Sequence, residues 1–385
     1  RIKMNNKLFS HSISPKKILR GEKAWEEGKT IIPLICKRPL ILGRSNATKN
    51  IRNSIHSELI PYGLNPIPSE LKYDCCELDL SQLKKLVIEK KCDGIIAAGG
   101  GKVLDAGKLL SNRLSLPCIT IPTSASTCAG WTSLSNIYSS KGAFIKDVTL
   151  DSCPELLIFD YSFIRQAPPR TLASGIADAL AKWYEASSTS NASTDGLVQQ
   201  AVQMARVLRD QLFIDGHEAF LNPKSEAWIR VAEGCGLTAG LIGGVGGSRC
   251  RTAAAHAIHN GLTQLIFSKK SLHGEIVIYG VLVQLYLEEV INKSQLAKQA
   301  SKQLIQFLTN LDLPTNLIDL NIEDTSIENL KMACEFACRD ESDIHRLPFK
   351  VNKNILLEAL TSSQDREPIV KLKTKSKTAN YLESQ

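Results

Sequence analysis

The sequence of 385 residues lacks the long apolar runs on which membrane anchoring and secretion depend. A transmembrane helix needs roughly 18 or more consecutive apolar residues. The most hydrophobic long segment, residues 276–291, is interrupted by Gln284, Glu288 and Glu289. The basic first 20 residues contain no apolar block of signal-peptide length. We therefore expect a cytoplasmic protein without a membrane partner.

Paired cysteines are also missing, although the chain holds 11 cysteines. They are odd in number and scattered, and no Cys-x-x-Cys pair occurs. This usage predicts reduced thiols packed as small hydrophobic side chains in a cytosolic protein. Hydrophobic residues make up 43 % and charged residues 22 % of the chain, which argues against a disordered or fibrous protein.

A net charge of +8 raises the question of nucleic-acid binding. The excess of basic residues lies within residues 1–24 and in a tail at about 371–385. Solvated tails are the usual place for such charge, so it is weak support for a nucleic-acid partner. We expect no nucleic acid, a small-molecule substrate and a homo-oligomer.

The pattern of the chain changes near residue 165. Before it, buried strands are predicted at 39–43, 93–98 and 116–121, with helical segments between them. This alternation predicts βαβ units and a parallel, Rossmann-like sheet. After the Pro168-Pro169 pair the periodicity is helical. We expect an α/β domain over 1–165 and an all-α domain over 166–385.

A glycine turn separates the second of these strands from the next helix. Gly99-Gly100-Gly101-Lys102 follows the strand, and Asp105 lies on the first turns of the helix. Glycine permits close approach of an anion, and the helix N-terminus offers N–H groups and a favourable dipole. The sequence is neither G-x-G-x-x-G nor a P-loop, so the turn indicates a pyrophosphate site by its position alone.

Histidines cluster in the helical half. His256, His259 and His273 lie close in sequence, and Asp178 lies in an otherwise apolar helix. A buried carboxylate is costly unless it is paired, and a metal cation removes that cost. Two imidazoles and one carboxylate form a three-ligand set with an open position, as in catalytic Zn²⁺ sites. The alternative is a satisfied core Asp among ordinary core histidines.

Five motifs in order resemble the iron-containing, or group III, alcohol dehydrogenases. They are GGGKVLD, PTSAST, GIADAL, AAAHAIHNG and HGE, within a resemblance over about residues 35–310. The most similar branches are the glycerol dehydrogenases and the hydroxycarboxylate dehydrogenases. The resemblance implies a dehydroquinate synthase-like fold, with a nucleotide-binding α/β domain, a metal-binding all-α domain and a cleft between them.

The resemblance also implies roles for individual residues. The metal ligands would be Asp178, His256 and His273, and the metal would be one divalent ion, Zn²⁺ rather than Fe²⁺, because Lys182 stands where iron-dependent members have another His. His259 would lie near the site, and either His259 or a water chain would carry the proton exchange. The nucleotide-binding residues would be Gly100, Gly101, Lys102, Asp105, Thr123, Ser126, Thr132, Leu134 and Tyr138.

One departure from the family pattern concerns the substrate. Glycerol dehydrogenases have an Asp that helps to hold the polyol where this chain has Cys128, which places glycerol in question. The surrounding residues 127–132 instead resemble the hydroxycarboxylate branch. Arg249 and Arg251 precede the His256 segment, and a guanidinium can hold a carboxylate through two hydrogen bonds.

A second departure concerns the nucleotide. NAD-dependent relatives carry an Asp at the end of the first strand, where this chain has Arg44. An acid repels a 2′-phosphate, whereas an Arg binds it, so we expect NADP in preference to NAD.

Together these features predict a metal-dependent, NAD(P)-linked oxidoreductase that interconverts an alcohol, either a hydroxy acid or a small polyol, and its carbonyl by hydride transfer. Glycerol dehydrogenase proper and glycerol-1-phosphate dehydrogenase are alternatives. A dehydroquinate synthase-type lyase uses Glu where this chain has Asp178, and a non-catalytic nucleotide-binding protein would have no need of the ligand set.

Overall fold

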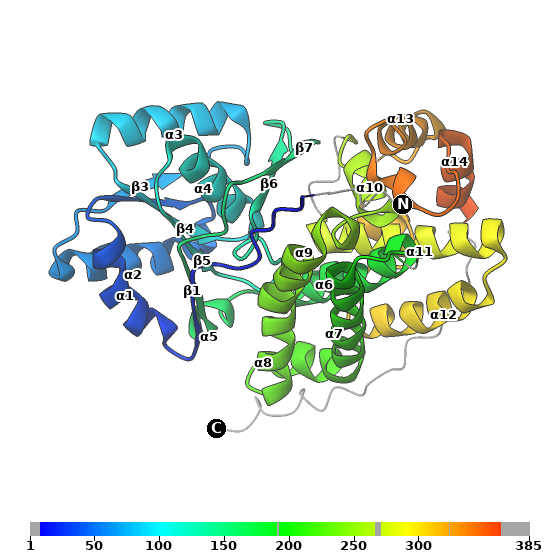
Figure 1. The fold of residues 1–385 in the computed structure, drawn as a ribbon, viewed down its shortest axis with the longest axis horizontal. Helices are drawn as coiled ribbons and strands as arrows, with labels where there is room; N and C mark the ends of the chain where they lie inside the picture. The colour runs from blue at the N-terminus through cyan, green and yellow to red at the C-terminus, as the bar shows by residue number, and fades with distance from the viewer. Residues whose placement is uncertain (1–7, 191, 266–270, 323, 363–385) are drawn as a thin grey trace, which may run out of the picture.

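The computed structural model describes residues 8–190, 192–265, 271–322 and 324–362. An α/β part and a helical part lie side by side in Figure 1, at the left and the right of the view. The basic tail expected at about 371–385 lies outside the described residues, as does the beginning of the basic N-terminal segment. No helix of the described chain combines the length and the apolarity needed to cross a membrane.

A six-stranded parallel sheet forms the centre of the α/β part. Its strand order is β1-β8-β5-β4-β2-β3. The strands are β1 (Lys17–Gly21), β2 (Pro39–Gly43), β3 (Ile67–Glu70), β4 (Gly94–Gly99), β5 (Cys118–Pro122) and β8 (Leu156–Asp160). The direction in which successive strands are added reverses between β2 and β4, and ligands bind outside the carboxyl ends of strands at such a point.

Helices cover both faces of the sheet because its inner strands are apolar on both sides. Leu40 and Leu42 of β2 pack against α3 (Glu77–Lys90) and α4 (Gly101–Leu114). Ile41 faces the opposite way, toward α1 (Ala24–Ile35) and α2 (Lys49–Leu59). Successive side chains of a strand point to opposite faces of the sheet, so a strand that is covered by helices on both faces needs apolar residues at every position.

A separate antiparallel hairpin extends from the sheet toward the helices. It consists of β6 (Leu134–Tyr138) and β7 (Phe144–Thr149). Figure 1 shows it between α4 and α10. The backbone N–H of Phe144 donates to Thr263 Oγ1 at 3.0 Å, and Gln264 donates to the Phe144 carbonyl at 2.9 Å. The hairpin therefore connects the two parts of the molecule.

The helical part follows β8 and contains the longest apolar helices. Its helices are α5 (Tyr161–Ile164), α6 (Pro169–Ser190), α7 (Gly196–Leu221), α8 (Glu226–Glu233), α9 (Ala239–Gly246), α10 (Ala254–Leu262), α11 (His273–Asn292), α12 (Gln295–Asn310), α13 (Ile327–Ala337) and α14 (Lys353–Ser362). A π-helical turn, Gly234–Thr238, joins α8 to α9. Short 3₁₀ turns occupy Asn46–Thr48, Ile60–Tyr62, Gly247–Cys250, Ile318–Leu320 and Asp343–Arg346.

Two glycines allow the central helix α6 to approach its neighbours closely. A Cβ at Gly175 would lie 1.9 Å from the Ala125 carbonyl oxygen, and one at Gly274 would lie 1.8 Å from the Ser174 carbonyl oxygen. Side chains at either position would force the backbones apart. Helix α6 thereby reaches both the loop after β5 and the start of α11.

The expected fold class, an α/β part with a parallel sheet followed by helices, is confirmed. The strands predicted at 39–43, 93–98 and 116–121 correspond to β2, β4 and β5, whereas β1, β3 and β6 were not predicted. The 11 cysteines are free thiols, and all but Cys338 are buried.

Candidate metal and nucleotide site

Three side chains from three different helices meet at the boundary between the two parts. Asp178 lies in α6, His256 in α10, and His273 is the first residue of α11. Asp178 Oδ1 is 3.4 Å from His256 Nε2 and 3.3 Å from His273 Nε2. One potential ligand atom from each residue lies within 4.8 Å of the others. The structure thus brings together the three residues predicted to bind a metal.

A buried carboxylate orients the first imidazole. Glu185, two turns beyond Asp178 on α6, is fully buried, and its Oε2 lies 2.6 Å from His256 Nδ1. Its Oε1 accepts the backbone N–H groups of Ala253 at 2.7 Å and His256 at 3.0 Å. Burial opposes charge on this imidazole, but the Glu185 and Asp178 carboxylates raise the pKa of His256 to about 9. With Nδ1 donating to Glu185, the Nε2 of a neutral His256 is an acceptor that faces Asp178.

The second imidazole is oriented by His259. His259 Nε2 lies 3.0 Å from His273 Nδ1, and His259 Nδ1 lies 2.9 Å from Asn260 Oδ1. An amide oxygen only accepts, so His259 donates through Nδ1 and accepts through Nε2. His273 then donates through Nδ1, and its Nε2 is likewise an acceptor that faces Asp178. Burial, together with the neighbouring His273, holds the pKa of His259 well below its ordinary value, in keeping with a neutral ring.

This arrangement is suited to a cation. Asp178 Oδ1 is buried and has no hydrogen-bond partner among the described residues, because neither imidazole contact has hydrogen-bonding geometry. In their protonated forms the two imidazoles hold the pKa of Asp178 well below its ordinary value, although burial opposes this effect. When the rings are neutral, as metal ligands must be, the carboxylate oxygen and the two imidazole lone pairs repel one another, and a divalent cation turns this repulsion into coordination. The residues present therefore fit a metal ion.

The triad lies in a cavity of about 190 Å³ that both parts of the molecule line. Lys182 and Cys128 line it beside Asp178, and Arg251 lines it from the segment before α10. The carboxyl edge of the sheet contributes Gly101, the first residue of α4. The cavity thus joins the metal-binding helices to the point where the sheet order reverses.

The glycine turn has the geometry expected of an anion site. Gly100 caps the N-terminus of α4 without a side-chain hydrogen bond, and a Cβ built on it would have no atom within 4 Å. At Gly101 a Cβ would lie 2.8 Å from Thr127 Cγ2. The Lys102 ammonium forms an ion pair with Asp74 and lies 4.6 Å above the Tyr138 ring. The open position at Gly100 leaves the first N–H groups of α4 accessible.

The remaining residues predicted to bind nucleotide fall into two groups. Six line the cavity: Gly101, Lys102, Asp105, Thr132, Leu134 and Tyr138. Asp105 is buried and forms an ion pair with Lys108 at 3.2 Å. The other predicted residues, Gly100, Thr123, Ser126 and Arg44, do not line it, and Arg44 is exposed at the end of β2.

Only some of the residues predicted to be catalytic line the cavity. Cys128 and Arg251 line the cavity, whereas Arg249 is exposed and does not. His259 is not among the lining residues either and contacts His273 from behind. Sequence reasoning overlooked Glu185 and the cavity-lining Asn260, and it named Lys182 without giving it a role. The positions of Lys182 and Glu185, four and seven residues after Asp178 on an apolar helix, could have indicated that all three share a face.

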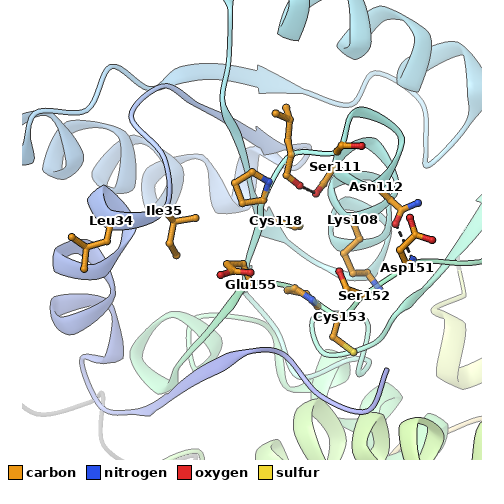
Figure 2. Close-up of a pocket in the computed structure, with 14 residues that line it drawn as sticks. Leu34, Ile35, Lys108, Ser111, Asn112, Cys118, Asp151, Ser152, Cys153 and Glu155 are labelled. Atoms are coloured by element: carbon orange, nitrogen blue, oxygen red, sulfur yellow. Dashed lines mark hydrogen bonds between the residues drawn. The ribbon is translucent and has the colours of Figure 1, made fainter. Parts of the chain in front are cut away.

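A larger cavity of about 540 Å³ lies at the opposite, amino edge of the sheet. Figure 2 shows Leu34 and Ile35 on one side and Asn112, Asp151 and Cys153 on the other. Burial raises the pKa of both thiols that line this cavity, Cys118 and Cys153, so neither is an activated nucleophile. Its size alone does not indicate chemistry, and the triad lies elsewhere.

Comparisons with known proteins agree with this geometry. The family model described as "Iron-containing alcohol dehydrogenase" matches residues 15–161. An uncharacterized oxidoreductase of Synechocystis is 47% identical over 357 residues, which cover 92% of each chain. Hydroxycarboxylate dehydrogenase A of Escherichia coli is 32% identical over 74% of this chain and 78% of its own. The crystal structure of glycerol dehydrogenase from Schizosaccharomyces pombe has a TM-score of 0.80 at 29% identity and covers 93% of this chain and 90% of that chain.

Proposed function

Because this chain belongs to the iron-containing alcohol dehydrogenase family, we propose that it interconverts an alcohol and its carbonyl by metal-assisted hydride transfer to a nicotinamide nucleotide. Membership makes it an oxidoreductase of the alcohol dehydrogenase type, and the family resemblance seen in the sequence is confirmed. The proposal adds the metal, the nucleotide, the substrate class and the role of each residue.

The meeting of Asp178 Oδ1 with two imidazole Nε2 atoms is the observation that carries this proposal. Asp178, His256 and His273 would hold a divalent ion, Zn²⁺ in preference to Fe²⁺. When bound, such an ion supplies Lewis acidity toward an alcohol or carbonyl oxygen. Glu185 and His259 keep the two ring nitrogens directed at one point, as hydrogen-bond partners behind the ring do for histidine ligands in metal sites.

The N-terminus of α4 is the proposed pyrophosphate site. Gly100 and Gly101 leave its amides accessible, and Lys102 adds a positive charge at the cavity wall. When bound, the nicotinamide supplies the hydride acceptor. Thr132, Leu134 and Tyr138, all from β6 or just before it, would orient its ring. In this proposal residues 1–165 bind nucleotide and residues 166–385 supply the metal ligands.

We favour NADP over NAD because of the charges at the ends of β2 and β3. Arg44 is exposed at the end of β2. Glu70, which ends the neighbouring strand β3, is paired with Arg52 at 2.5 Å. The acid that would repel a 2′-phosphate is thus already neutralised.

His259 is better suited to orienting His273 than to exchanging a proton with substrate. Its Nε2 is engaged by His273, and Asn260 lies between its Nδ1 and the cavity. We therefore propose that protons leave the site through solvent in the cavity. Of the two routes that the sequence left open, this proposal takes the water chain in preference to His259.

Turnover of a panel of alcohol and carbonyl pairs with each nucleotide tests the proposal. Reduced-nucleotide absorbance reports turnover, and metal analysis on the same preparation reports metal content. We expect activity that falls on exhaustive chelation and returns with one equivalent of Zn²⁺ per chain. Full turnover in a preparation shown to contain no metal, or none with any pair after reconstitution, contradicts the proposal.

A further inference from the structure

We propose that Lys182 and Arg251 form an oxyanion subsite beside the metal ligands, so that the substrate is an alcohol bearing a carboxylate or a phosphate close to its carbinol carbon. This inference rests on the proposed function and narrows its substrate class. It uses Lys182, to which sequence reasoning gave no role, and selects Arg251 over Arg249.

The ammonium group of Lys182 is buried and has few hydrogen-bond acceptors. It lies four residues after Asp178 on α6, is 6 % exposed and lines the cavity. Its three N–H donors find one acceptor among the described residues, the Arg251 carbonyl oxygen at 3.4 Å. Within that same part of the chain no carboxylate lies within 4.0 Å of it. A buried charge without a partner is costly, so two free donors at a cavity wall indicate an anion that is bound there.

Arg251 is the second cation of this subsite. Its guanidinium forms no hydrogen bond or ion pair with any residue that the structure describes, although the side chain lines the cavity and is partly buried. Its Cγ lies 3.1 Å from where a Cβ of Gly243 would be, so this glycine of α9 makes room for the side chain. Burial lowers the pKa of Arg251, which shows that nearby acids do not compensate for it.

The acids around the cavity are engaged elsewhere or are exposed. Asp343 pairs with Arg346 at 2.8 Å and also accepts from Thr252. Asp105 pairs with Lys108 at 3.2 Å. Asp147 lines the cavity and raises the pKa of Arg251, but it is exposed and lies beyond ion-pair distance of that side chain. Asp178 and Glu185 favour the charge on Lys182 from a distance, but neither Lys182 nor Arg251 forms an ion pair with a carboxylate of the described residues.

Cys128 keeps this wall positive. It is 8 % exposed and lines the cavity with Lys182, and burial raises the pKa of its thiol, so the side chain is neutral. An aspartate in the same place would supply a carboxylate to Lys182. The thiol leaves the ammonium available to the substrate.

The position of the subsite limits the size of the substrate. Lys182 lies four residues, or about 6 Å along the helix axis, from Asp178. An oxyanion on Lys182 and a hydroxyl directed at the Asp178 triad would therefore lie within a few bonds of one another. This spacing favours small 2-hydroxy acids or short phosphorylated polyols.

Matched three-carbon substrates test this inference. Glycerate, glycerol phosphate and glycerol share a carbinol and differ in the group beside it, and both enantiomers of the chiral substrates are included. For the wild type we expect kcat/KM on one of the anionic substrates to exceed that on glycerol by at least ~100-fold, as a charge-assisted bidentate contact allows. Preference for glycerate or for glycerol phosphate identifies the carboxylate or the phosphate as the bound group.

Two neutral variants, Lys182→Met and Arg251→Met, should each raise KM for the preferred anion by roughly 10–100-fold. The loss on glycerol should be at least ~10-fold smaller than the loss on the preferred anion, and Arg251→Lys should recover part of the loss on the anion because it restores the charge. Arg206→Met, an exposed change on α7, is the control. Equal losses on glycerol and on the anions would overturn the subsite.

The reverse design is Cys128→Asp. A carboxylate beside Lys182 should reduce the preference for the anion over glycerol by at least ~10-fold; an unchanged preference contradicts the inference.

Calorimetric titration with oxamate, an unreactive carboxylate, distinguishes failure of the oxyanion subsite from failure of the proposed function. Oxamate binding that Arg251→Met abolishes, without turnover of any substrate, leaves the subsite and removes the proposed function. Turnover of glycerol, glycerate and glycerol phosphate with equal efficiency, and no oxamate binding, leaves the function and removes the subsite.

Discussion

Glu185 Oε2 lies 2.6 Å from His256 Nδ1, and both side chains are buried. The carboxylate comes from the same helix, α6, as Asp178, so one helix supplies a potential ligand and the group that orients another. Because Glu185 also accepts the backbone N–H groups of Ala253 and His256, it fixes the start of α10 as well as the ring. Such outer partners are worth about 10–100-fold in metal affinity in other proteins.

Glu185→Gln should therefore weaken metal binding without unfolding the protein. The amide keeps the shape, but its NH₂ group cannot accept from His256 Nδ1 while its oxygen serves the backbone donors. We expect the Kd for Zn²⁺ to rise by roughly 10–100-fold, measured by competition with a chromogenic chelator. Glu233→Gln, which alters a carboxylate paired with Arg20 away from the triad, should leave the Kd unchanged. An unaltered Kd in Glu185→Gln would show that its role is confined to the backbone contacts.

Gly100→Ala should show whether Gly100 is needed for nucleotide binding or for the stability of the fold. A Cβ at Gly100 meets no atom within 4 Å, so Tm should change by no more than a degree or two. The same methyl group would stand where the pyrophosphate approaches the amides of α4, and KM for the nucleotide should rise by about 10-fold or more. Gly196→Ala, at the first position of α7 and equally open, is the control for both measurements. Unchanged nucleotide KM in Gly100→Ala would place the pyrophosphate elsewhere.

Arg44→Asp should reverse the nucleotide preference. The acid would repel a 2′-phosphate and bind ribose hydroxyls instead, so kcat/KM should fall by at least ~10-fold with NADPH and rise with NADH. Lys90→Asp makes the same charge change at the end of α3, before β4 begins, and should affect both nucleotides equally. A wild-type enzyme that already prefers NADH would refute the premise of this prediction.

Gly175→Ala should destabilise the fold although alanine is the better helix former. Propensity alone favours alanine by up to ~1 kcal/mol. The methyl group would lie 1.9 Å from the Ala125 carbonyl oxygen, and backbone has no rotamer by which to move away. We expect a net loss of about 1–3 kcal/mol in the free energy of unfolding, measured by urea denaturation. Stabilisation by this change would mean that α6 and the loop after β5 lie farther apart than described.

Strands and helices with a clear hydrophobic pattern of their own were predictable from the sequence. Strands that are recognised only by their hydrogen bonds to a neighbouring strand were not. The apolar run at Pro39–Gly43 identifies β2 because both of its faces are buried. Strand β3, Ile67–Glu70, contains Pro68 at the edge of the sheet and alternates partly buried with exposed residues. A short edge strand of this kind resembles a loop in sequence. Its pairing with β2 alone defines it as a strand.

The candidate site divides in the same way. Asp178, His256 and His273 could be named from residue type, spacing and family resemblance, and the structure brings them together. Glu185 and Lys182 could not be given roles, since an acid and a base on one helix usually indicate a solvated face. Only the packing of α10 against α6 shows that both are buried. Arg249 and Arg251 are equivalent in sequence, and the local turn decides which one lines the cavity.

The β6–β7 hairpin has a consequence for how the molecule unfolds. Its first strand is held by Asp105, whose backbone carbonyl accepts from Ser135, and its second strand is held by Thr263 at the end of α10. The two attachments cannot both survive if the sheet and the helices separate, so the two parts should lose structure in one cooperative transition. Nucleotide binding should then slow amide hydrogen exchange in α10 as well, although α10 touches no part of the proposed pyrophosphate site. The hairpin makes the two halves of this enzyme a single unit of folding.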